Sequence, residues 1–278
     1  VALLDAAAEG HSVTIHALAE LGADLDIANE VDQLRAIHYA ASYNHASAVR
    51  ALVERGCDVN ATNGYGETAL HFIAQEGHEA VLAVLLDAAR ERVDLDARAE
   101  DDWTAMHWAA HQGHDNMLST LTEAGAKVDA VDSHGRTPMC TAVLAAECTC
   151  LRTLHDAGGS LTAVANNDMT LLDNALLAAR HDPGRYNEVI KQLIAMGSEV
   201  GWPLATQAVG RMTHEPRLNE SAFVLMLAYL SDGNPCGQYH LAYIHSTFSS
   251  PEQQRQLFDA AVLNADSPLW VCLTVASV

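Results

Sequence analysis

The stretch from Asp101 to Asp132 reads DDWTAMHWAAHQGHDNMLSTLTEAGAKVDAVD, and it is the clearest copy of a unit that recurs along most of the chain. The unit opens at Thr104, continues through Met106-His107 and two alanines, and reaches Gly113-His114 before an apolar stretch. Equivalent opening positions fall at 35, 68, 104, 137 and 170, which are 33, 36, 33 and 33 residues apart. A sequence period near 33 residues indicates a repeat architecture.

Fixed places in each copy hold the residue types that begin and end short helices. Threonine at the opening position is a good N-cap, because its hydroxyl accepts hydrogen bonds from unpaired amides at a helix start. Pro138 follows Thr137 in a first turn, where no amide donor is needed. Glycines follow the apolar helical runs, where a left-handed residue ends a helix, at positions 56, 125, 158 and 197. Each unit is therefore predicted to contain two short helices and a hairpin-like loop.

Small residues recur on the first predicted helix of each copy. Alanines at 40, 41, 74, 109 and 110 allow a neighbouring helix to approach closely. Because one unit cannot bury its apolar face alone, successive units are expected to stack into a solenoid.

The order T-P-L-H, A, G-H, L-L and G-A-D-V-N-A, much of which each copy keeps, resembles the ankyrin repeat. Clear copies begin at Arg35, Thr68, Thr104, Thr137 and Thr170, and a partial copy opens the chain. The resemblance implies an all-α ankyrin-repeat solenoid of stacked helix-turn-helix units with β-hairpin-like finger loops. We expect this array over residues 1–200, as about six repeats of which the first is partial.

Two copies depart from the common length, and the motif fades after them. Residues 64–99 hold three extra residues near Ala88–Arg92, which are expected to lengthen the second helix. Residues 166–200 hold an insertion at His181-Asp182-Pro183-Gly184, a turn sequence, and the second helix is expected from Tyr186 to just before Gly197. Residues 201–278 are expected to form divergent ankyrin-like repeats or a C-terminal helical cap; a separate small α-helical domain is the alternative.

The charge balance restricts the kind of partner. The chain has 15 basic and 36 acidic side chains, a net charge of −21, and 49% of its residues are hydrophobic. Such a surface repels nucleic-acid phosphates and anionic lipids and attracts basic proteins. No run of 18 apolar residues occurs, so no membrane span is expected.

The cysteines and the first residues bear on the setting of the chain. Six cysteines lie at 57, 140, 148, 150, 236 and 272, and their spacing fits no disulfide framework. We therefore expect reduced thiols in an intracellular, cytoplasmic protein. The chain has no initiator methionine and begins within a repeat, so we expect it to be part of a longer polypeptide.

Histidine spacing raises a metal site as the alternative to a structural role. His107 and His111 lie one helical turn apart, as zinc-binding pairs do. However, His107 has counterparts at His38 and His71, and His114 has counterparts at positions 11, 45 and 78. The repeat therefore explains every one of these histidines except His111, which favours structural roles without a metal ion.

Other candidate chemistry is weaker still. Cys148 and Cys150, with His155 nearby, lack the second cysteine pair of a zinc site and are expected to be buried thiols. The chain has no G-x-x-x-x-G-K-[ST] loop, no G-x-S-x-G elbow and no H-E-x-x-H motif. We therefore expect neither catalysis nor a cofactor in this segment.

An acidic run precedes Thr104 and consists of Asp94, Asp96, Glu100, Asp101 and Asp102. It lacks the glycine and the distal glutamate of a calcium loop. We place it in the hairpin before Thr104, where it forms either a solvated finger or an acidic rim that faces a basic ligand.

The resemblance implies that the finger tips and the inner helices line a concave face to which ankyrin proteins bind other proteins. Positions on this face vary between copies while the framework repeats, which separates candidate contacts from scaffold. These positions are Leu34, Ser42, Tyr43, Tyr65, Glu67, Gln75, Glu76, Asp101, Trp103, His111, Gln112, His134 and Arg136.

Aromatic and arginine side chains dominate binding energy at protein interfaces. We therefore expect Trp103, flanked by Tyr65 and Tyr43, to act as an anchor, and Arg136 to add a bidentate donor. The alternative is that Trp103 only covers a hairpin.

The sequence predicts a non-catalytic interaction scaffold or adaptor with a basic protein partner. Two rival interpretations are a structural subunit within a large multiprotein complex and a regulatory arm of a larger enzyme or channel. In addition, Asn60 resembles the position at which asparagine hydroxylation can occur in the family. An intact mass without the added oxygen would exclude that modification.

Overall fold

The structure is a computed structural model, and it describes residues 1–166, 169–179 and 182–198. The chain divides into two compact units, Val1–Asn166 and Asn167–Val278. The helices expected beyond residue 200 lie outside the described residues, and the predicted array boundary at residue 200 stays a prediction.

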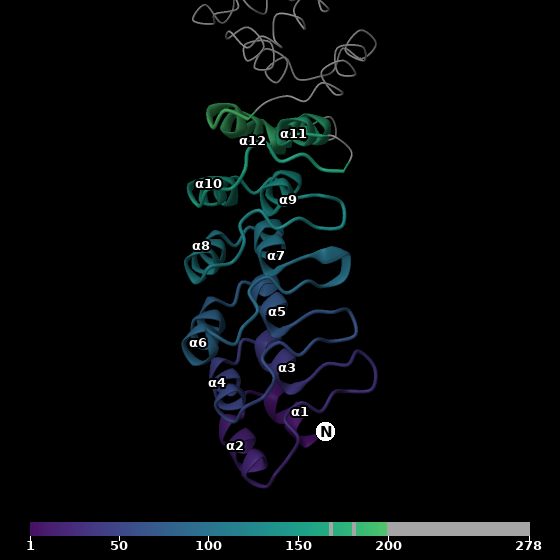
Figure 1. Cartoon of the computed structure of the whole chain (residues 1–278), viewed down its shortest axis with the longest axis vertical. Coiled ribbons are helices and arrows are strands. Elements are labelled where there is room, and N and C mark those ends of the chain that lie inside the picture. Colours follow the sequence, from purple (N-terminus) through teal and green to yellow (C-terminus); the bar gives the residue numbers. More distant parts are fainter. Residues whose placement is uncertain (167–168, 180–181, 199–278) are drawn as a thin grey trace, which may run out of the picture. The chain divides into compact units, whose positions relative to one another are not determined.

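The first unit is a stack of helix pairs joined by loops (Figure 1). The first helices of the pairs, here called inner helices, form one column and pack on one another. They are α1 (Ala2–Ala8), α3 (Ala36–Ser42), α5 (Ala69–Glu76), α7 (Ala105–Gln112) and α9 (Pro138–Ala145). The second, outer helices form a parallel column: α2 (Ser12–Glu20), α4 (Ala46–Glu54), α6 (Glu79–Ala89), α8 (Asp115–Ala124) and α10 (Cys148–Asp156). The predicted all-α solenoid is therefore confirmed for this unit.

The inner helices begin as the repeat motif predicts. Thr68, Thr104 and Thr137 are N-cap residues with extended backbones, and Pro138 lies in the first turn of α9. The Oγ1 atom of Thr137 accepts a hydrogen bond from the amide of Cys140 at 3.3 Å. Such a bond satisfies one of the amides that a helix start leaves without an intrahelical partner.

The helix ends and the inner column also follow the predicted pattern. Backbone φ angles of 91°, 106°, 88° and 87° confirm the left-handed conformation expected at glycines 56, 125, 158 and 197. The alanines at 40, 41, 74, 109 and 110 are completely buried. Their small side chains let successive inner helices pack at close range, so most of the space between the helices is filled.

Outer helices supply the larger core side chains. Leu52, Leu85 and Leu121 occupy corresponding places on α4, α6 and α8, and all three are completely buried. Helix α6 has 11 residues, against 9 in α4 and 10 in α8, which confirms the predicted lengthening.

The described part of the second unit holds α11 (Leu171–Ala179) and α12 (Pro183–Ala195), which pack against each other. The sequence prediction placed the start of the second helix near Tyr186, and the structure starts it at Pro183. The reason is local, because Pro183 suits a first turn and the Oδ1 atom of Asp182 accepts the amide of Arg185 at 3.1 Å. What was interpreted as turn chemistry at Asp182-Pro183-Gly184 is a helix start.

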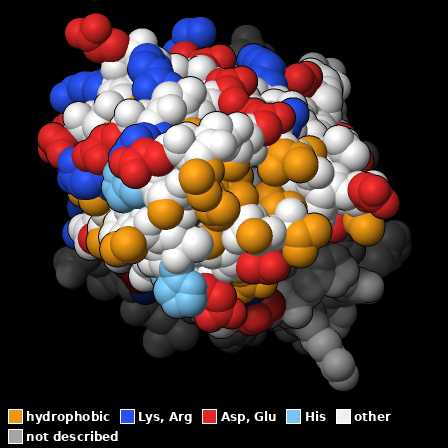
Figure 2. Space-filling model, turned by 90° about the horizontal axis from the view of Figure 1, so that it is seen from below, with side chains coloured by type: hydrophobic (Ala, Val, Ile, Leu, Met, Phe, Trp, Pro, Cys, Tyr) orange, Lys and Arg blue, Asp and Glu red, His pale blue; other side chains and the backbone are white. Residues whose placement is uncertain are grey.

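The end of the first unit that carries the N-terminus exposes a hydrophobic patch. Figure 2, which looks at this end, shows hydrophobic side chains gathered beside acidic ones. Thr14 and Ala17 on α2 are exposed there, whereas their counterparts Ala48 and Ala51 on α4 are buried. Among the described residues, the α1 and α2 pair therefore packs against a neighbour on one side, and the next pairs pack on both sides.

Candidate functional site

Four finger loops project from the inner-helix side of the first unit (Figure 1). Each is closed by a hydrogen bond between the amide of its first residue and the carbonyl oxygen of its last. The first finger is 29–34 (2.8 Å), the second 63–67 (2.9 Å), the third 99–103 (2.8 Å) and the fourth 132–136 (3.0 Å). The fingers are hairpin-like, and in the described part of the chain they include one isolated antiparallel bridge, between Ala28 and Arg35.

Adjacent fingers are tied to each other through their backbones. An amide near each tip donates to a carbonyl oxygen near the tip of the preceding finger. The bonds are Gly64 to Asp32 (2.8 Å), Glu100 to Tyr65 (3.0 Å), Ser133 to Asp101 (2.9 Å) and Asn166 to His134 (2.9 Å). The tips therefore form a fixed row, from which side chains at the variable positions are displayed.

A side chain at the base braces the first, second and fourth fingers from within. The Oδ1 atom of Asn63 accepts the amides of Tyr65 and Glu67, both at 2.9 Å. Asp132 accepts two amides in the same way, at 2.9 and 2.8 Å, and Asn29 does so in the first finger. Asparagine and aspartate are favoured in turns because they make such local bonds.

The third finger departs from this pattern because Ala99 stands at the brace position and has no side-chain acceptor. Its tip instead forms a short 3-10 helix, η1 (Glu100–Asp102). Asp101 and Asp102 have φ angles of 58° and 60°, in the left-handed region. In the neighbouring fingers, Gly66 and Gly135 stand at the position of Asp102. Glycine adopts the left-handed conformation without a steric cost.

Buried histidines link three inner helices, α3, α5 and α7, to the loop of the next repeat. Nδ1 of His71 accepts from the Thr68 amide at 3.0 Å, and its Nε2–H donates to the carbonyl oxygen of Trp103 at 3.2 Å. His107 repeats this arrangement with Thr104 and Arg136. His38 accepts from the Arg35 amide, and its Nε2 bonds the carbonyl oxygen of Ala61 at 2.8 Å, two residues before the second finger. Burial lowers the pKa of all three, to about 4 for His38, so each is a neutral imidazole at pH 7.

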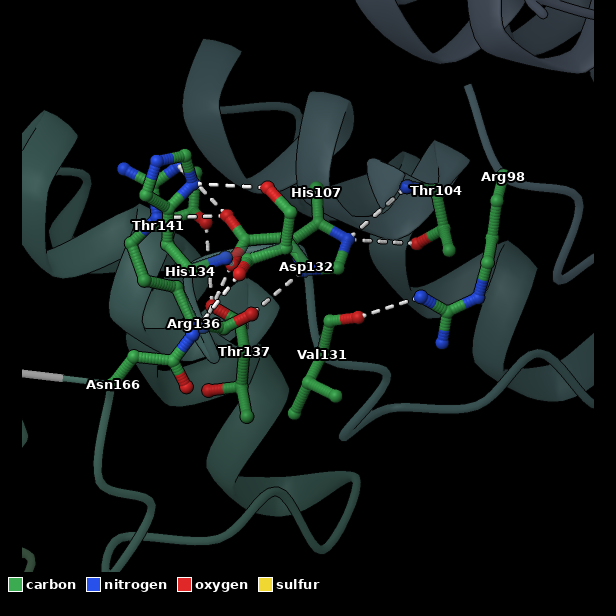
Figure 3. A network of polar contacts seen from close by, with 11 residues as sticks. Arg98, Thr104, His107, Val131, Asp132, His134, Arg136, Thr137, Thr141 and Asn166 are labelled. Carbon is green, nitrogen blue, oxygen red and sulfur yellow. Dashed lines mark hydrogen bonds and ion pairs between the residues drawn. The ribbon is translucent and has the colours of Figure 1, made fainter. Parts of the chain in front are cut away.

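These bonds confirm the structural role predicted for His107, which caps the start of α7 (Figure 3). Both of its ring nitrogens are engaged, one with Thr104 and the other with the carbonyl oxygen of Arg136. The second histidine series is also structural, because Nε2 of His45, His78 and His114 bonds a carbonyl of the preceding inner helix at 2.9–3.1 Å. Among the described residues, no group of three potential metal ligands lies together.

The candidate contact residues lie on the fingers and inner helices, and none is buried. The exposed ones are Tyr43, Tyr65, Glu76, Asp101, His111, Gln112 and His134. The half-buried ones are Leu34, Ser42, Glu67, Gln75, Trp103 and Arg136. Their side chains are therefore presented along the face formed by the finger row and the inner helices.

Trp103 packs on its own repeat. Its ring meets Trp108 edge-on with 4.7 Å between centroids, His111 edge-on at 5.6 Å, and His107 in a stacked arrangement at 6.0 Å. The Trp103–Trp108 pair joins the residue before the N-cap to the fourth helical residue, the geometry of a hydrophobic staple. Trp103 thus covers its hairpin as the alternative interpretation held, yet it stays half-exposed.

Arg136 is engaged within the fourth finger. Its Nε and one terminal nitrogen each lie 2.7 Å from Oδ2 of Asp132, whose side chain is fully buried (Figure 3). Burial disfavours the charged carboxylate, but the hydrogen bonds and charge of Arg136 outweigh that effect and hold the pKa of Asp132 below its usual range. The Arg136 guanidinium, which was expected to bind a partner, therefore already neutralises the buried Asp132 carboxylate.

Three partly exposed aromatic residues on this face escaped the sequence interpretation: Tyr39, Phe72 and Trp108. Each lies four residues after the opening position of its repeat. The signal was present, since the same offset holds an aromatic residue in three successive copies and Thr141 in the fourth.

The acidic run does not form one cluster, so its placement in a single hairpin was wrong. Asp94 and Asp96 lie in the loop after α6, where Oδ1 of Asp96 accepts the Lys127 amide at 2.8 Å. Glu100, Asp101 and Asp102 lie at the tip of the third finger. Only the latter three belong to the finger row.

Asn60 and the described cysteines have structural surroundings. The Asn60 amide group donates to the carbonyl oxygen of Arg92 at 2.7 Å and accepts the Asp94 amide at 2.8 Å. Burial raises the pKa of the Cys57 and Cys150 thiols to about 12, so neither is a ready nucleophile at neutral pH. Within the described ranges, no helix is long and apolar enough to cross a membrane.

A family model described as ankyrin repeats in three copies matches residues 3–97 and 89–165. With the helix pairs, fingers and capping histidines, this match shows that the chain belongs to the ankyrin-repeat family, whose members generally mediate protein–protein interactions and are typically not enzymes. Among solved structures, the chain is similar to the ankyrin repeat domain of Bcl-3, described as a unique member of the IkappaB protein family. The identity is 29% and the TM-score 0.65, over 72% of this chain and 87% of that one. No curated protein matches.

Proposed function

We propose that the chain is a non-catalytic scaffold or adaptor that binds a protein partner through its finger and inner-helix face, the concave face of the family. The observation that carries this proposal is that repeated residues hold the repeats together, whereas variable residues are exposed. Repeated residues such as His71 and His114 make bonds between neighbouring repeats. The positions that vary from copy to copy, such as Tyr65 and His111, are exposed and project from a fixed framework.

A basic partner suits this face. Glu67 of the second finger, Glu76 of α5 and the acidic tip of the third finger lie on it, in a chain with a net charge of −21. Opposite charge speeds encounter and excludes acidic partners, nucleic acid included. Binding is therefore expected to weaken as salt rises, since exposed charges are screened over about 8 Å at physiological ionic strength.

The cellular setting and the larger context are part of the proposal. Thiols at 57, 140, 148 and 150 fit a reducing compartment, and we place the chain inside the cell, in the cytoplasm. A structural subunit of a large complex would be held through several faces, and a regulatory arm would act on a domain elsewhere in a longer chain. Cross-links confined to the fingers and inner helices favour an adaptor over a structural subunit.

The test is capture of partners from cell extract by the whole chain and by the Tyr65→Ala/Trp103→Ala variant. The matched control is Val13→Ala/Leu21→Ala, which removes two exposed apolar side chains at α2 (80% and 85% exposed), away from the fingers. Loss of a captured protein in the first variant alone supports the proposal, provided thermal melting shows that the variant is folded. A partner that both variants retain contradicts binding through this face.

A further inference from the structure

The third finger and α7 combine features that no other described repeat combines. An aromatic cluster lies at the base of this finger, and uncompensated carboxylates lie at its tip. We call Glu100, Asp101, Trp103, Trp108 and His111 the third-finger site. The inference drawn from it deepens the proposed function and rests on that function.

The aromatic part offers a π surface at the edge of the finger row. Trp103 and Trp108 are both half-exposed, and their rings meet edge-on at 4.7 Å, so they present faces in two directions. His111 adds a third ring, 5.6 Å from Trp103. Indole has the ring face that attracts cations most strongly. At the place of Trp103 the other fingers carry Leu34, Glu67 and Arg136, none of which can serve this purpose.

The acidic part distinguishes this finger from the second and the fourth. The first finger has Glu30 and Asp32 but carries Leu34 where this finger has Trp103. Glu100 and Asp101 are exposed, and within the described part of the chain neither forms an ion pair. Asp102, in contrast, has the Arg98 guanidinium 3.6 Å away. At the positions of Glu100 and Asp101, the second finger has Gly64 and Tyr65. The fourth finger has Ser133 and His134 there.

The backbone joins the two parts at short range. The amide of Trp103 donates to the carbonyl oxygen of Glu100 at 3.3 Å, so the carboxylates and the indole belong to one tight turn. Because Ala99 provides no brace, the side chains of this tip are less restrained from within the finger than those of the second and fourth. The side chains of Glu100 and Asp101 are therefore able to adjust to a group placed over the indole, while the backbone of the tip stays in the finger row.

We propose that the third-finger site takes an arginine side chain of the protein partner. The guanidinium plane stacks on the half-exposed Trp103 ring, with the edge-on Trp108 ring beside it, and its edge donates hydrogen bonds to the carboxylates of Asp101 and Glu100. A planar guanidinium stacks on aromatic faces and offers paired donors to a carboxylate, whereas the lysine ammonium is a compact, strongly hydrated charge. Charge complementarity and the planar surface together select arginine.

The experiment uses the whole chain labelled with ¹⁵N and the small probe N-acetyl-arginine methylamide. Indole N–H signals of Trp103 and Trp108, assigned with single Trp→Phe variants, report binding in the spectrum. Saturable shifts of these two signals are expected with the arginine probe. The isosteric, uncharged N-acetyl-citrulline methylamide should give no saturable shift, and the lysine analogue should bind more weakly.

The variant Glu100→Gln/Asp101→Asn removes both charges and keeps residues of similar shape, with asparagine tolerated in the left-handed region. It should weaken probe binding about fivefold, the effect of losing a modest ion-pair contribution. The control Glu79→Gln/Glu123→Gln makes the same charge change at exposed positions on α6 and α8 and should stay within about twofold, because those charges are distant and screened.

Several outcomes would overturn the inference: no shift with the arginine probe, equal binding of citrulline or lysine, or equal weakening by the control. These results are distinct from failure of the proposed function. If the probe does not bind but Tyr65→Ala/Trp103→Ala loses its captured partner, only the arginine site is wrong. If the probe binds and partner capture is unaffected, binding of partners through this face is wrong.

Discussion

The Nε2–H of His107 donates to the carbonyl oxygen of Arg136 at 3.0 Å, which joins an inner helix to the base of the following finger across 29 residues of sequence. The same ring accepts from the Thr104 amide through Nδ1 at 3.2 Å. One side chain thus starts its own helix and holds the next repeat in register. Interfaces between neighbouring repeats, of which this bond is part, provide much of the stability of a solenoid.

Replacing His107 by alanine should therefore destabilise the array strongly. The change leaves a buried amide and a buried carbonyl without partners and opens a cavity, so a loss of about 2–4 kcal/mol in the free energy of unfolding is expected. Urea unfolding followed by circular dichroism measures it. His111→Ala on the same helix is the control and should cost under about 0.5 kcal/mol, because His111 is exposed. Equal effects of the two changes would contradict the capping role.

The buried histidines also make stability depend on pH. Burial lowers the pKa of His38 from 6.5 to about 4, and it lowers the pKa of His71 and His107. The unfolded chain therefore binds more protons than the folded one between pH 6.5 and pH 4. Stability is fully present above pH 6.5 and falls as the pH drops through this window.

For His38 alone the loss between pH 7.5 and pH 4 is about 3 kcal/mol, and His71 and His107 add to it. Urea midpoints measured across this range test the expectation. The His38→Gln variant should be less stable at pH 7.5 yet show a shallower dependence on pH, since glutamine does not titrate. An unchanged slope in that variant would show that carboxylates alone cause the dependence.

The Arg136–Asp132 pair gives a third prediction. Arg136→Met leaves the buried Asp132 carboxylate without its cation, and a cost of about 3 kcal/mol is expected, as for other broken buried pairs. The second finger offers a natural replacement, because the Nδ2 atom of Asn63 donates to Glu67 at 2.8 Å at the corresponding positions.

The double variant Asp132→Asn/Arg136→Glu copies that pair and should recover most of the lost stability. Thermal melting of the wild type, Arg136→Met and the double variant decides the matter. Arg98→Met serves as a control, because its ion pair with Asp102 is about half-exposed and should contribute under about 1 kcal/mol. If the double variant is no more stable than Arg136→Met, the two finger bases are not interchangeable.

Much of this fold could be predicted from sequence because each framework residue serves one local purpose. Residues such as Thr104 and Pro138 mark where helices begin, and Gly125 marks where one ends. The regular recurrence of such residues along the chain defines the repeat unit. The start of α12 was misplaced because Asp-Pro-Gly suits both a turn and a helix N-terminus. The hydrogen bond from the Arg185 amide to Oδ1 of Asp182, at 3.1 Å, is what marks a helix start here.

The candidate site was less predictable, because exposure and partners depend on which neighbours a side chain meets. Variation between copies predicted that Tyr65 and His111 are exposed, as they are, yet it could not show that Arg136 is bound to a buried carboxylate. Nor did the sequence separate Asp96 from Asp101. Asp96 accepts the Lys127 amide in the loop after α6, whereas Asp101 lies at the tip of the third finger. In both cases, nearness in sequence did not show which side chains share surroundings in the fold.

The last prediction concerns the unbraced third finger. Ala99→Asn should restore the side-chain acceptor that Asn63 provides in the second finger, and Asp102→Gly should relieve the left-handed backbone that Gly66 adopts without cost. Each change is expected to stabilise the chain by about 0.5–1 kcal/mol, through a new turn bond or lower backbone strain. Thermal melting measures the gain, and Ser47→Ala, an exposed position on α4, controls for surface substitutions in general.

A rise in melting temperature with weaker binding of the arginine probe would show that the finger's freedom is used in recognition. A fall in melting temperature for both variants would mean that the present conformation of the tip is held by contacts that a braced turn cannot make.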